Sequence, residues 1–392
     1  MARLTPTPTS LATDPNAIAA LGGLKNYQGI NQSLLNVYNP ALALNDTASA
    51  NRAGAQLSPT ATNSAASSAI TAAYNPIPSA VNDRLDGIRV AQATGNNSKS
   101  SGIATGESAT NKAVWGRAFG GTADQDQRNN VSGYHANFAG FMIGGDVEAT
   151  PDWRIGGVAS YAHTNVDNDG NNNGSSASVN GYGLTAYAGY GNDTKPWYLN
   201  LTAGAARQHY DTSRNINFTG FSGVAKGSFN GDLYSMTAQA GYPLKVNAAT
   251  FTPLAGVSYS RLNQDSYTET GGNGAALRVK DSAVNSLMSD VGMRVEQSFD
   301  NTYGTLTPWA QLSWRHEFHD NGLNTSASLA VDPSGSTAFS TKGATLVPDT
   351  ARLVLGVTLV KSDHLSLLAR YNLDGASGYT AQTGDVTVRW AF

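Results

Sequence analysis

The stretch Gly384-Asp385-Val386-Thr387-Val388-Arg389-Trp390-Ala391-Phe392 is the last of the sequence and alternates apolar with polar residues. With the period of two of a β-strand, one face carries Val386, Val388, Trp390 and Phe392. The other face carries Asp385, Thr387 and Arg389. In a membrane barrel the apolar face contacts lipid, aromatic residues lie at the lipid–water boundary, and the lumen accepts charged side chains. A strand that ends in two large aromatic residues therefore favours a transmembrane barrel over a soluble sheet.

The composition narrows the class of protein. Only 14% of the 392 residues are charged, which is low for a soluble protein. No run approaches the roughly 18 to 20 apolar residues of a spanning helix, so a helical membrane protein is excluded, whereas alternating strands are not. The net charge of −3 predicts no nucleic-acid partner. The sequence has no cysteine, which suits an envelope protein, and its six histidines show no metal spacing, so we predict no metal and no cofactor.

The N-terminal part of the sequence differs from the rest in its composition and in its hydrophobic pattern. We assign residues 1–60 to a passenger remnant or an extracellular linker, and residues 61–92 to a helical segment that could thread a pore. Ser79 can cap a helix there, and the apolar stripe is thin, formed by Val81, Leu85 and Ile88. Such a helix suits a polar tunnel of limited bore. Residues 93–112 are rich in Gly, Ser, Asn and Thr and are expected to form a flexible linker.

Strand-like alternation runs through residues 113–392, which we assign to the barrel. About twelve segments are visible, beginning near Val114, Tyr134, Trp153, Ser178, Trp197, Ser228, Thr250, Val284, Gly304, Thr350, Leu365 and Ala381. The connections between them alternate between short turns and long polar loops. An antiparallel transmembrane barrel has an even number of strands, with short turns on the periplasmic side and long loops outside. The alternation of short and long connections is therefore typical of such a barrel.

The polar faces of these segments share arginine, acidic, glycine and small polar residues. A charge on the lipid face near the bilayer centre costs about 2 to 4 kcal/mol, so the polar faces should line the lumen. The residues expected to line the pore are Arg117, Asp146, Asp290, Arg294, Glu296, Gln311, Arg315, Glu317, Arg370 and Arg389. The first strand is less clear, because Arg117 shares its face with Trp115 and Phe119, and its orientation stays open.

Several motifs together resemble one family. They are Val114-Trp115-Gly116-Arg117-Ala118-Phe119-Gly120-Gly121, Gly140-Phe141-Met142-Ile143-Gly144-Gly145-Asp146, Tyr210-Asp211-Thr212-Ser213-Arg214, the run from Leu306 to Phe318, Arg84-Leu85 before the linker, and the closing strand. Over residues 40–392 the sequence resembles the translocator, or β-domain, of monomeric autotransporters, the type V secretion proteins of Gram-negative bacteria. Each motif alone is weak, and their order makes the match specific.

This resemblance implies a 12-stranded outer-membrane barrel, threaded by the helix that precedes the first strand, which anchors and exports an N-terminal passenger to the cell surface. It implies a monomer whose partners are outer-membrane lipid, periplasmic chaperones, the barrel assembly machinery and its own passenger. The closing residues Val386, Val388, Trp390 and Phe392 would be the signal read by the assembly machinery. Passengers of the family usually have some hundreds of residues, so we expect this one to be removed or very short.

Asn82-Asp83 in the predicted pore helix is the strongest candidate for chemistry. Some relatives release the passenger by cyclisation of an asparagine within this helix, helped by lumen carboxylates. The carboxylates that could act here, with a pKa raised by like-charged neighbours, are Asp146, Asp290, Glu296 and Glu317. The favoured alternative is that Asn82 and Asp83 are solvated helix residues and that the acids pair with lumen arginines to fill the tunnel.

Other candidate sites give weaker signals. His316 lies between Arg315 and Glu317 but faces the opposite side of the strand, so we assign it a structural role. His209 and Asp211 share a face and could form an acid–base pair, but no activated serine accompanies them. The loop at 168–174 lacks the terminal glutamate of a calcium loop and should be a flexible outer loop. The alternatives to a non-enzymatic translocator are a barrel that acts through its loops as an adhesin, protease or esterase, and, less favoured, a porin.

Overall fold

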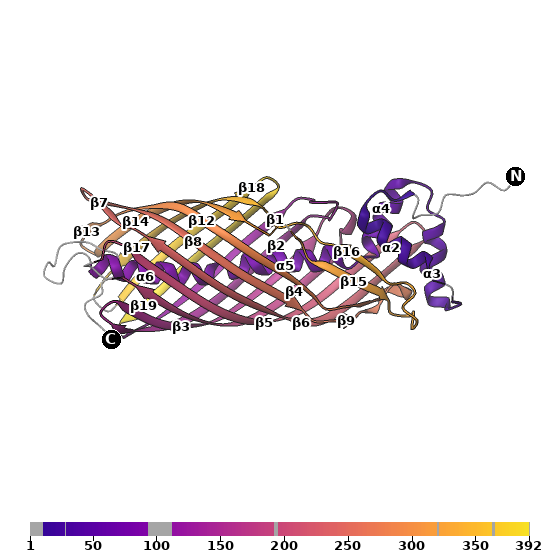
Figure 1. The fold of residues 1–392 in the computed structure, drawn as a ribbon, viewed down its shortest axis with the longest axis horizontal. Helices are drawn as coiled ribbons and strands as arrows, with labels where there is room; N and C mark the ends of the chain where they lie inside the picture. Colours follow the sequence, from indigo (N-terminus) through magenta and orange to yellow (C-terminus); the bar gives the residue numbers. More distant parts are fainter. Residues whose placement is uncertain are drawn as a thin grey trace.

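The computed structural model describes residues 11–27, 29–92, 112–191, 195–319, 321–362 and 365–391. Twelve long strands form the wall of a barrel (Figure 1): β1 (Lys112–Gln125), β2 (Tyr134–Thr150), β3 (Trp153–Asn168), β4 (Ser176–Tyr190), β5 (Tyr198–Phe218), β6 (Phe221–Gly241), β8 (Ala249–Gln264), β12 (Ser282–Gln297), β14 (Gly304–Glu317), β17 (Asp349–Val360), β18 (Leu365–Ala376) and β19 (Tyr379–Ala391). Among the helices described, none combines the length and the apolar character needed to cross a bilayer.

The barrel is closed by antiparallel pairing of its first and last strands. β1 pairs with β19 from Ala113↔Ala391 to Gln125↔Tyr379, so neither strand leaves an open edge. The predicted fold class, a 12-stranded antiparallel barrel, is confirmed. The strands begin within two residues of the expected positions, except β6, which begins at Phe221 instead of near Ser228. Gly223 and Gly227 made that stretch resemble a loop in the sequence.

Alternation along the strands separates a lipid-facing side from a lumen side. In β19, Val386, Val388 and Trp390 are about half exposed on the outside, whereas Asp385 and Arg389 are buried in the lumen. The open question about β1 is resolved in favour of the lumen, because Trp115, Arg117 and Phe119 are all buried. The two aromatic rings find room because glycines face them: a Cβ on Gly144 would lie 2.3 Å from the Trp115 ring, and one on Gly140 would lie 2.4 Å from the Phe119 ring.

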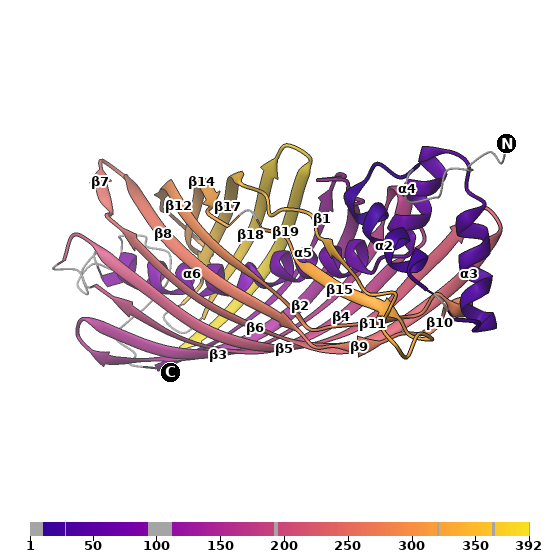
Figure 2. The ribbon, with the colours of Figure 1, turned by 45° about the vertical axis from the view of Figure 1, so that its right-hand side comes forward.

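A helical cap and a small sheet cover one end of the barrel (Figure 2). The cap consists of α2 (Pro15–Lys25), α3 (Gln32–Leu42) and α4 (Thr47–Gln56), and the sheet of β9 (Tyr267–Thr268), β11 (Leu277–Val279), β15 (Asn324–Leu329) and β16 (Phe339–Lys342). Asn16 joins the two parts, since its side chain donates to the Lys342 carbonyl at 2.7 Å and accepts from the Lys342 amide at 2.9 Å. This amide side chain therefore pairs with the free edge of β16, as a neighbouring strand would.

Two further helices run inside the barrel along its axis (Figure 1): α5 (Thr60–Tyr74) and α6 (Pro76–Gln92). The junction falls at Asn75, because Pro76 has no amide hydrogen and takes the first position of a new helix. The helices lie off-centre: α5 packs mainly on β2, β3 and β4, and α6 on β5. At the closest point the Leu85 side chain fills the space where Gly189 lacks a Cβ. Free space is therefore left along the opposite wall.

Candidate functional site

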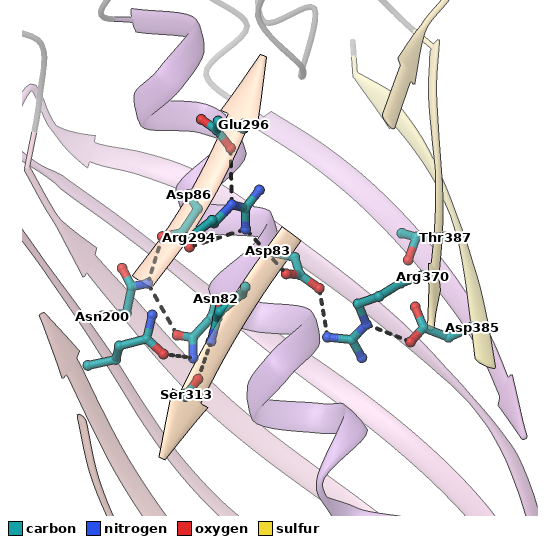
Figure 3. Close-up of polar contacts among 12 residues, drawn as sticks. Asn82, Asp83, Asp86, Asn200, Arg294, Glu296, Ser313, Arg370, Asp385 and Thr387 are labelled. Atoms are coloured by element: carbon teal, nitrogen blue, oxygen red, sulfur yellow. Dashed lines mark hydrogen bonds and ion pairs between the residues drawn. The ribbon is translucent and has the colours of Figure 1, made fainter. Parts of the chain in front are cut away.

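One turn of α6 places the Asp83 carboxylate among three arginines of the barrel wall, of which Arg294 and Arg370 are labelled in Figure 3. The Asp83 carboxylate lies 3.1 Å from Arg117 Nη2 of β1, 3.0 Å from Arg370 Nη1 of β18 and 3.7 Å from Arg294 Nη1 of β12. The Asp83 side chain is only 10% exposed, and each arginine less. Charged groups so poorly hydrated must be paired with one another to be tolerated.

Each of these arginines is also held by the wall itself. Arg117 and Arg370 both contact Asp385, at 3.3 Å and 2.7 Å, and Arg117 Nε also donates to Thr387 at 2.6 Å. Arg294 pairs with Glu296 at 3.0 Å, and its guanidinium lies 4.0 Å above the Trp309 ring, a cation–π contact. The guanidinium groups are consequently fixed in position by the barrel, and the helix supplies the carboxylate that they share.

A second cluster joins α6 to the neighbouring part of the wall, formed by β2, β3 and β4. Arg84 binds both oxygens of Asp146 of β2, each at 2.7 Å. The same carboxylate accepts from Arg154 of β3 at 2.5 Å and from the Tyr187 hydroxyl of β4 at 2.8 Å. Two arginines and a phenol thus saturate one buried carboxylate, a geometry that favours its charged form.

The other predicted pore-lining residues lie along the lumen and contact neighbours. Asp290 pairs with Arg315 at 3.6 Å. Glu317 accepts from the Leu287 amide at 2.9 Å and from the Ser286 hydroxyl, and Gln311 donates to Ser313 at 3.1 Å. Arg389 is buried and lines a lumen cavity beside α6.

Sequence reasoning missed a bidentate ion pair within this wall. Arg352 Nε and Nη2 donate to the two oxygens of Asp374 at 2.6 Å and 2.8 Å. The two residues are directly opposite each other on β17 and β18, and Asp374 shares its face with Arg370. Extending the alternation of that strand by two residues would have found Asp374, and Arg352 with it. Arg154, at the other end of the lumen, was also missed, because it follows a turn directly.

Asn82 lies in a network of amides. Its Nδ2 donates to Gln239 Oε1 at 2.8 Å, and its Oδ1 accepts from Asn200 Nδ2 at 3.2 Å (Figure 3). Asn200 also contacts Asp86 at 3.3 Å, one helical turn further along α6. The four carboxylates considered as possible bases each contact other groups, described above. The amide of Asn82 is therefore held across the lumen by other amides.

Two cavities that share the lining residues Asn75, Ser260 and Arg315 follow the side of the lumen that the helices leave free. The first, of about 1030 Å³, is lined by Asn82, Asp83 and Asp86 of α6 and by polar residues of the wall. The second, of about 930 Å³, continues past α5 and is lined by Ser64, Glu317 and Tyr379, among others. A third cavity of about 600 Å³ lies at the other side of Asp83. The helices thus fill only part of the lumen.

Neither His316 nor His209 has the geometry of a catalytic triad. His316 contacts Asp349 at 2.9 Å on the side opposite Arg315 and Glu317, in agreement with the structural role assigned to it. His209 lies 3.6 Å from Asp211, and the structure adds Ser228 at 3.4 Å. Both groups face the same atom, Nε2, so the imidazole cannot be oriented by the acid through one nitrogen while activating the serine through the other.

The outer loop at 168–174 is docked onto the cap. The Asn172 side chain is buried and donates to the Ala55 carbonyl at 3.2 Å, while Gln56 Nε2 donates to the Asn171 carbonyl at 2.8 Å. The loop that we expected to be flexible is therefore hydrogen-bonded to the end of α4. Within the ranges that the structure describes, no group of three or more histidine, aspartate or glutamate side chains is arranged to hold a metal ion.

The residues predicted as an assembly signal lie on the lipid side where the structure describes them. Val386, Val388 and Trp390 point outward from β19. Phe392 lies outside the described residues. Recognition of this strand by an assembly machinery stays a prediction.

Comparison with known proteins gives a consistent result. The profile of the autotransporter β-domain family matches residues 114–372. The extracellular serine protease of Serratia marcescens is 23% identical over 291 residues, which are 74% of this chain and 27% of that protein. This chain therefore spans about a quarter of the length of that relative.

Solved structures with the same fold include two autotransporter domains. The translocator domain of NalP from Neisseria meningitidis superposes with a TM-score of 0.58 at 17% identity, covering 80% of this chain and 97% of that one. The β-domain of the Bordetella autotransporter BrkA gives a TM-score of 0.54 at 20% identity, covering 72% and 99%. At such identities the likeness concerns the fold.

Proposed function

Because the chain belongs to the autotransporter β-domain family, we propose that it is a translocator that carries an N-terminal passenger through the outer membrane and anchors it at the cell surface. Membership of this family implies insertion in the outer membrane. The observation that carries the proposal is a helix inside the barrel that is bound to the wall through Asp83 and Arg84. A porin has no use for a polypeptide fixed in its pore.

The course of the chain supports export toward the capped end. α5 and α6 lead from the cap through the lumen, and β1 begins at the end where β19 finishes (Figure 1). The cap thus lies at the end of the barrel that carries the long loops, which is the outside of such a barrel. We propose that the N-terminal segment is at the cell surface, that the domain works as a monomer, and that its partners are outer-membrane lipid, periplasmic chaperones and the barrel assembly machinery.

Removal of the threaded segment tests the proposal. We expect a variant that lacks residues 60–92 to insert as a folded barrel, to conduct ions several-fold better than the full chain in planar bilayers, and to leave an epitope tag fused before residue 11 off the cell surface. The full chain with the same tag should expose it to protease added to intact cells. Equal conductance of the two barrels, or a tag of the full chain that stays in the periplasm, would contradict the proposal.

We propose that the domain acts without enzymatic chemistry. Asn82 is bound by the amides of Gln239 and Asn200, and the lumen carboxylates contact other groups, so the geometry favours a structural helix. We expect Asn82→Ala to leave the size of the folded and denatured protein unchanged on gels. A fragment that begins after residue 82 in the unmutated protein, and is lost in the variant, would demonstrate self-cleavage instead.

The loops offer little support for the alternative of a surface enzyme. The His209 site has the wrong connectivity for a catalytic triad, and its side chains are about half exposed. The relative named as an extracellular serine protease is a much longer protein, of which this chain matches only a part. We therefore do not propose a protease activity for this chain.

A further inference from the structure

The three arginines around Asp83 form a preorganised group. Arg117, Arg294 and Arg370 come from β1, β12 and β18, and their side chains are 1%, 8% and 4% exposed. Wall residues hold each guanidinium from behind, through Asp385, Thr387 and Glu296. Their remaining donors converge on a single carboxylate. Such a convergence of fixed donors is how proteins bind carboxylate and phosphate anions.

We propose that Arg117, Arg294 and Arg370 form a carboxylate-binding site of the barrel wall, and that Asp83 occupies it as an internal ligand that fixes the axial position of the threaded helix. The site receives small carboxylates when the Asp83 side chain is absent. Its role in positioning the helix rests on the translocator function, whereas binding of an anion does not.

The charges of this part of the lumen agree with an anion site. The wall and α6 place six arginines here, against five carboxylates. The arginines are Arg84, Arg117, Arg154, Arg294, Arg370 and Arg389, and the carboxylates are Asp83, Asp86, Asp146, Glu296 and Asp385. Loss of Asp83 would increase the excess of positive charge in a poorly hydrated place, which strengthens the attraction for another anion.

The site can be reached by a small ligand. Asp83 borders both the cavity of about 1030 Å³ and the one of about 600 Å³. Arg370 lines the larger of these two cavities, and Arg117 and Arg294 line the smaller one. An acetate ion that enters the lumen could therefore approach the three guanidinium groups from either side of α6.

The helix sequence makes the site sensitive to sliding in one direction. A slide by one turn moves the helix about 5 to 6 Å and would bring residue 79 or 80, or in the other direction residue 86 or 87, to the level of the arginines. Ser79 and Ala80 carry no charge, whereas Asp86 carries a carboxylate. The site therefore resists the slide that brings Ser79 or Ala80 to the arginines, because no second carboxylate is available in that direction.

Chemical rescue tests the binding site. We expect Asp83→Ala to lower the temperature at which the folded barrel unfolds on semi-native gels. Sodium acetate should restore much of this loss, sodium chloride at equal ionic strength should not, and the unmutated protein should respond to neither. Asp86→Ala is the matched control on the same helix, because Asp86 is ion-paired with Arg294 at 3.7 Å, whereas Asp83 is ion-paired with all three arginines. Asp83→Asn, whose side chain has the same shape but no charge, is a second comparison: it should lose stability without rescue by acetate, because the amide still fills the site.

Cysteine pairs report the axial position, since the natural chain has no cysteine. The pair Leu85→Cys with Gly189→Cys should form a disulfide in the native position, where Leu85 lies against Gly189. Adding Asp83→Ala should reduce this disulfide and increase that of Val81→Cys with Gly189→Cys, and acetate should reverse the change. Equal effects of acetate and chloride, or unchanged cross-linking in Asp83→Ala, would overturn the proposal. A tag on the unmutated chain that stays off the cell surface would instead count against the translocator function and would leave the anion site untouched.

Discussion

Asp146→Ala is expected to destabilise the folded barrel by about 3 to 5 kcal/mol, the usual cost of breaking a buried ion pair by removing one partner. Asp146 is 6% exposed and accepts hydrogen bonds from Arg84, Arg154 and Tyr187. Without the carboxylate, two guanidinium groups remain in the lumen with no shared counter-charge. The change also releases α6 from β2, because Arg84 is the helix residue that binds Asp146.

Equilibrium unfolding in urea, followed by the mobility of the folded barrel on semi-native gels, would measure this effect. Asp152→Ala is the matched control: Asp152 belongs to the turn between β2 and β3, and its ion pair with Lys195 is 3.7 Å long and exposed. Exposed pairs of this kind contribute about 0 to 1 kcal/mol, so this variant should behave almost like the parent protein. Comparable losses in both variants would show that burial of Asp146 has no special importance.

The alternation of the strands allowed the barrel, and most of its lumen face, to be predicted from sequence. A period of two assigns each side chain to one face, and the cost of a charge in lipid makes that assignment reliable for Arg294, Arg370 and Arg389. Trp115 was harder, because its place in the lumen depends on Gly144 in the neighbouring strand. The face of an aromatic residue depends on the space available, which a single strand does not reveal.

The interaction partners of the lumen residues were harder to predict from the sequence than the face on which each residue lies. Arg352 and Asp374 face each other across one strand pair and could be found by aligning two hairpin strands. The surroundings of Asp83 could not, because they depend on the depth and rotation of α6 inside the barrel. A helix position is set by many contacts at once, and α6 has only a thin apolar stripe to guide it.

The cap was the part least visible in the sequence. Its three helices are short and its contacts with the loops join residues that are more than a hundred positions apart, as in the bond from Gln56 to Asn171. Local features do explain why the helices form: Asn31 and Asp46 accept hydrogen bonds from the first amides of α3 and α4. Propensity and capping therefore account for the helices but not for where they dock.

Arg214→Ala should free this cap from the barrel. Arg214 of β5 is almost completely buried, forms an ion pair with Glu269, and donates to the carbonyls of Gln56 at 2.6 Å and Ala275 at 2.7 Å. It thus ties the end of α4 to the loop between β9 and β11. Removing it leaves a buried carboxylate and two carbonyls without their donor, at a cost of about 3 kcal/mol or more.

Limited trypsin digestion would detect the release, because Lys25 and Arg52 lie in the cap helices and are cleaved only when these open. A cost of about 3 kcal/mol raises the open population roughly a hundredfold, and the cleavage rate with it. Arg207→Ala, on the same strand, removes an arginine that is 52% exposed and should leave cleavage unchanged. If both variants are cut at the parental rate, the cap is held by its other contacts, such as the Asn16 bonds to β16, and Arg214 is only one of several equivalent ties.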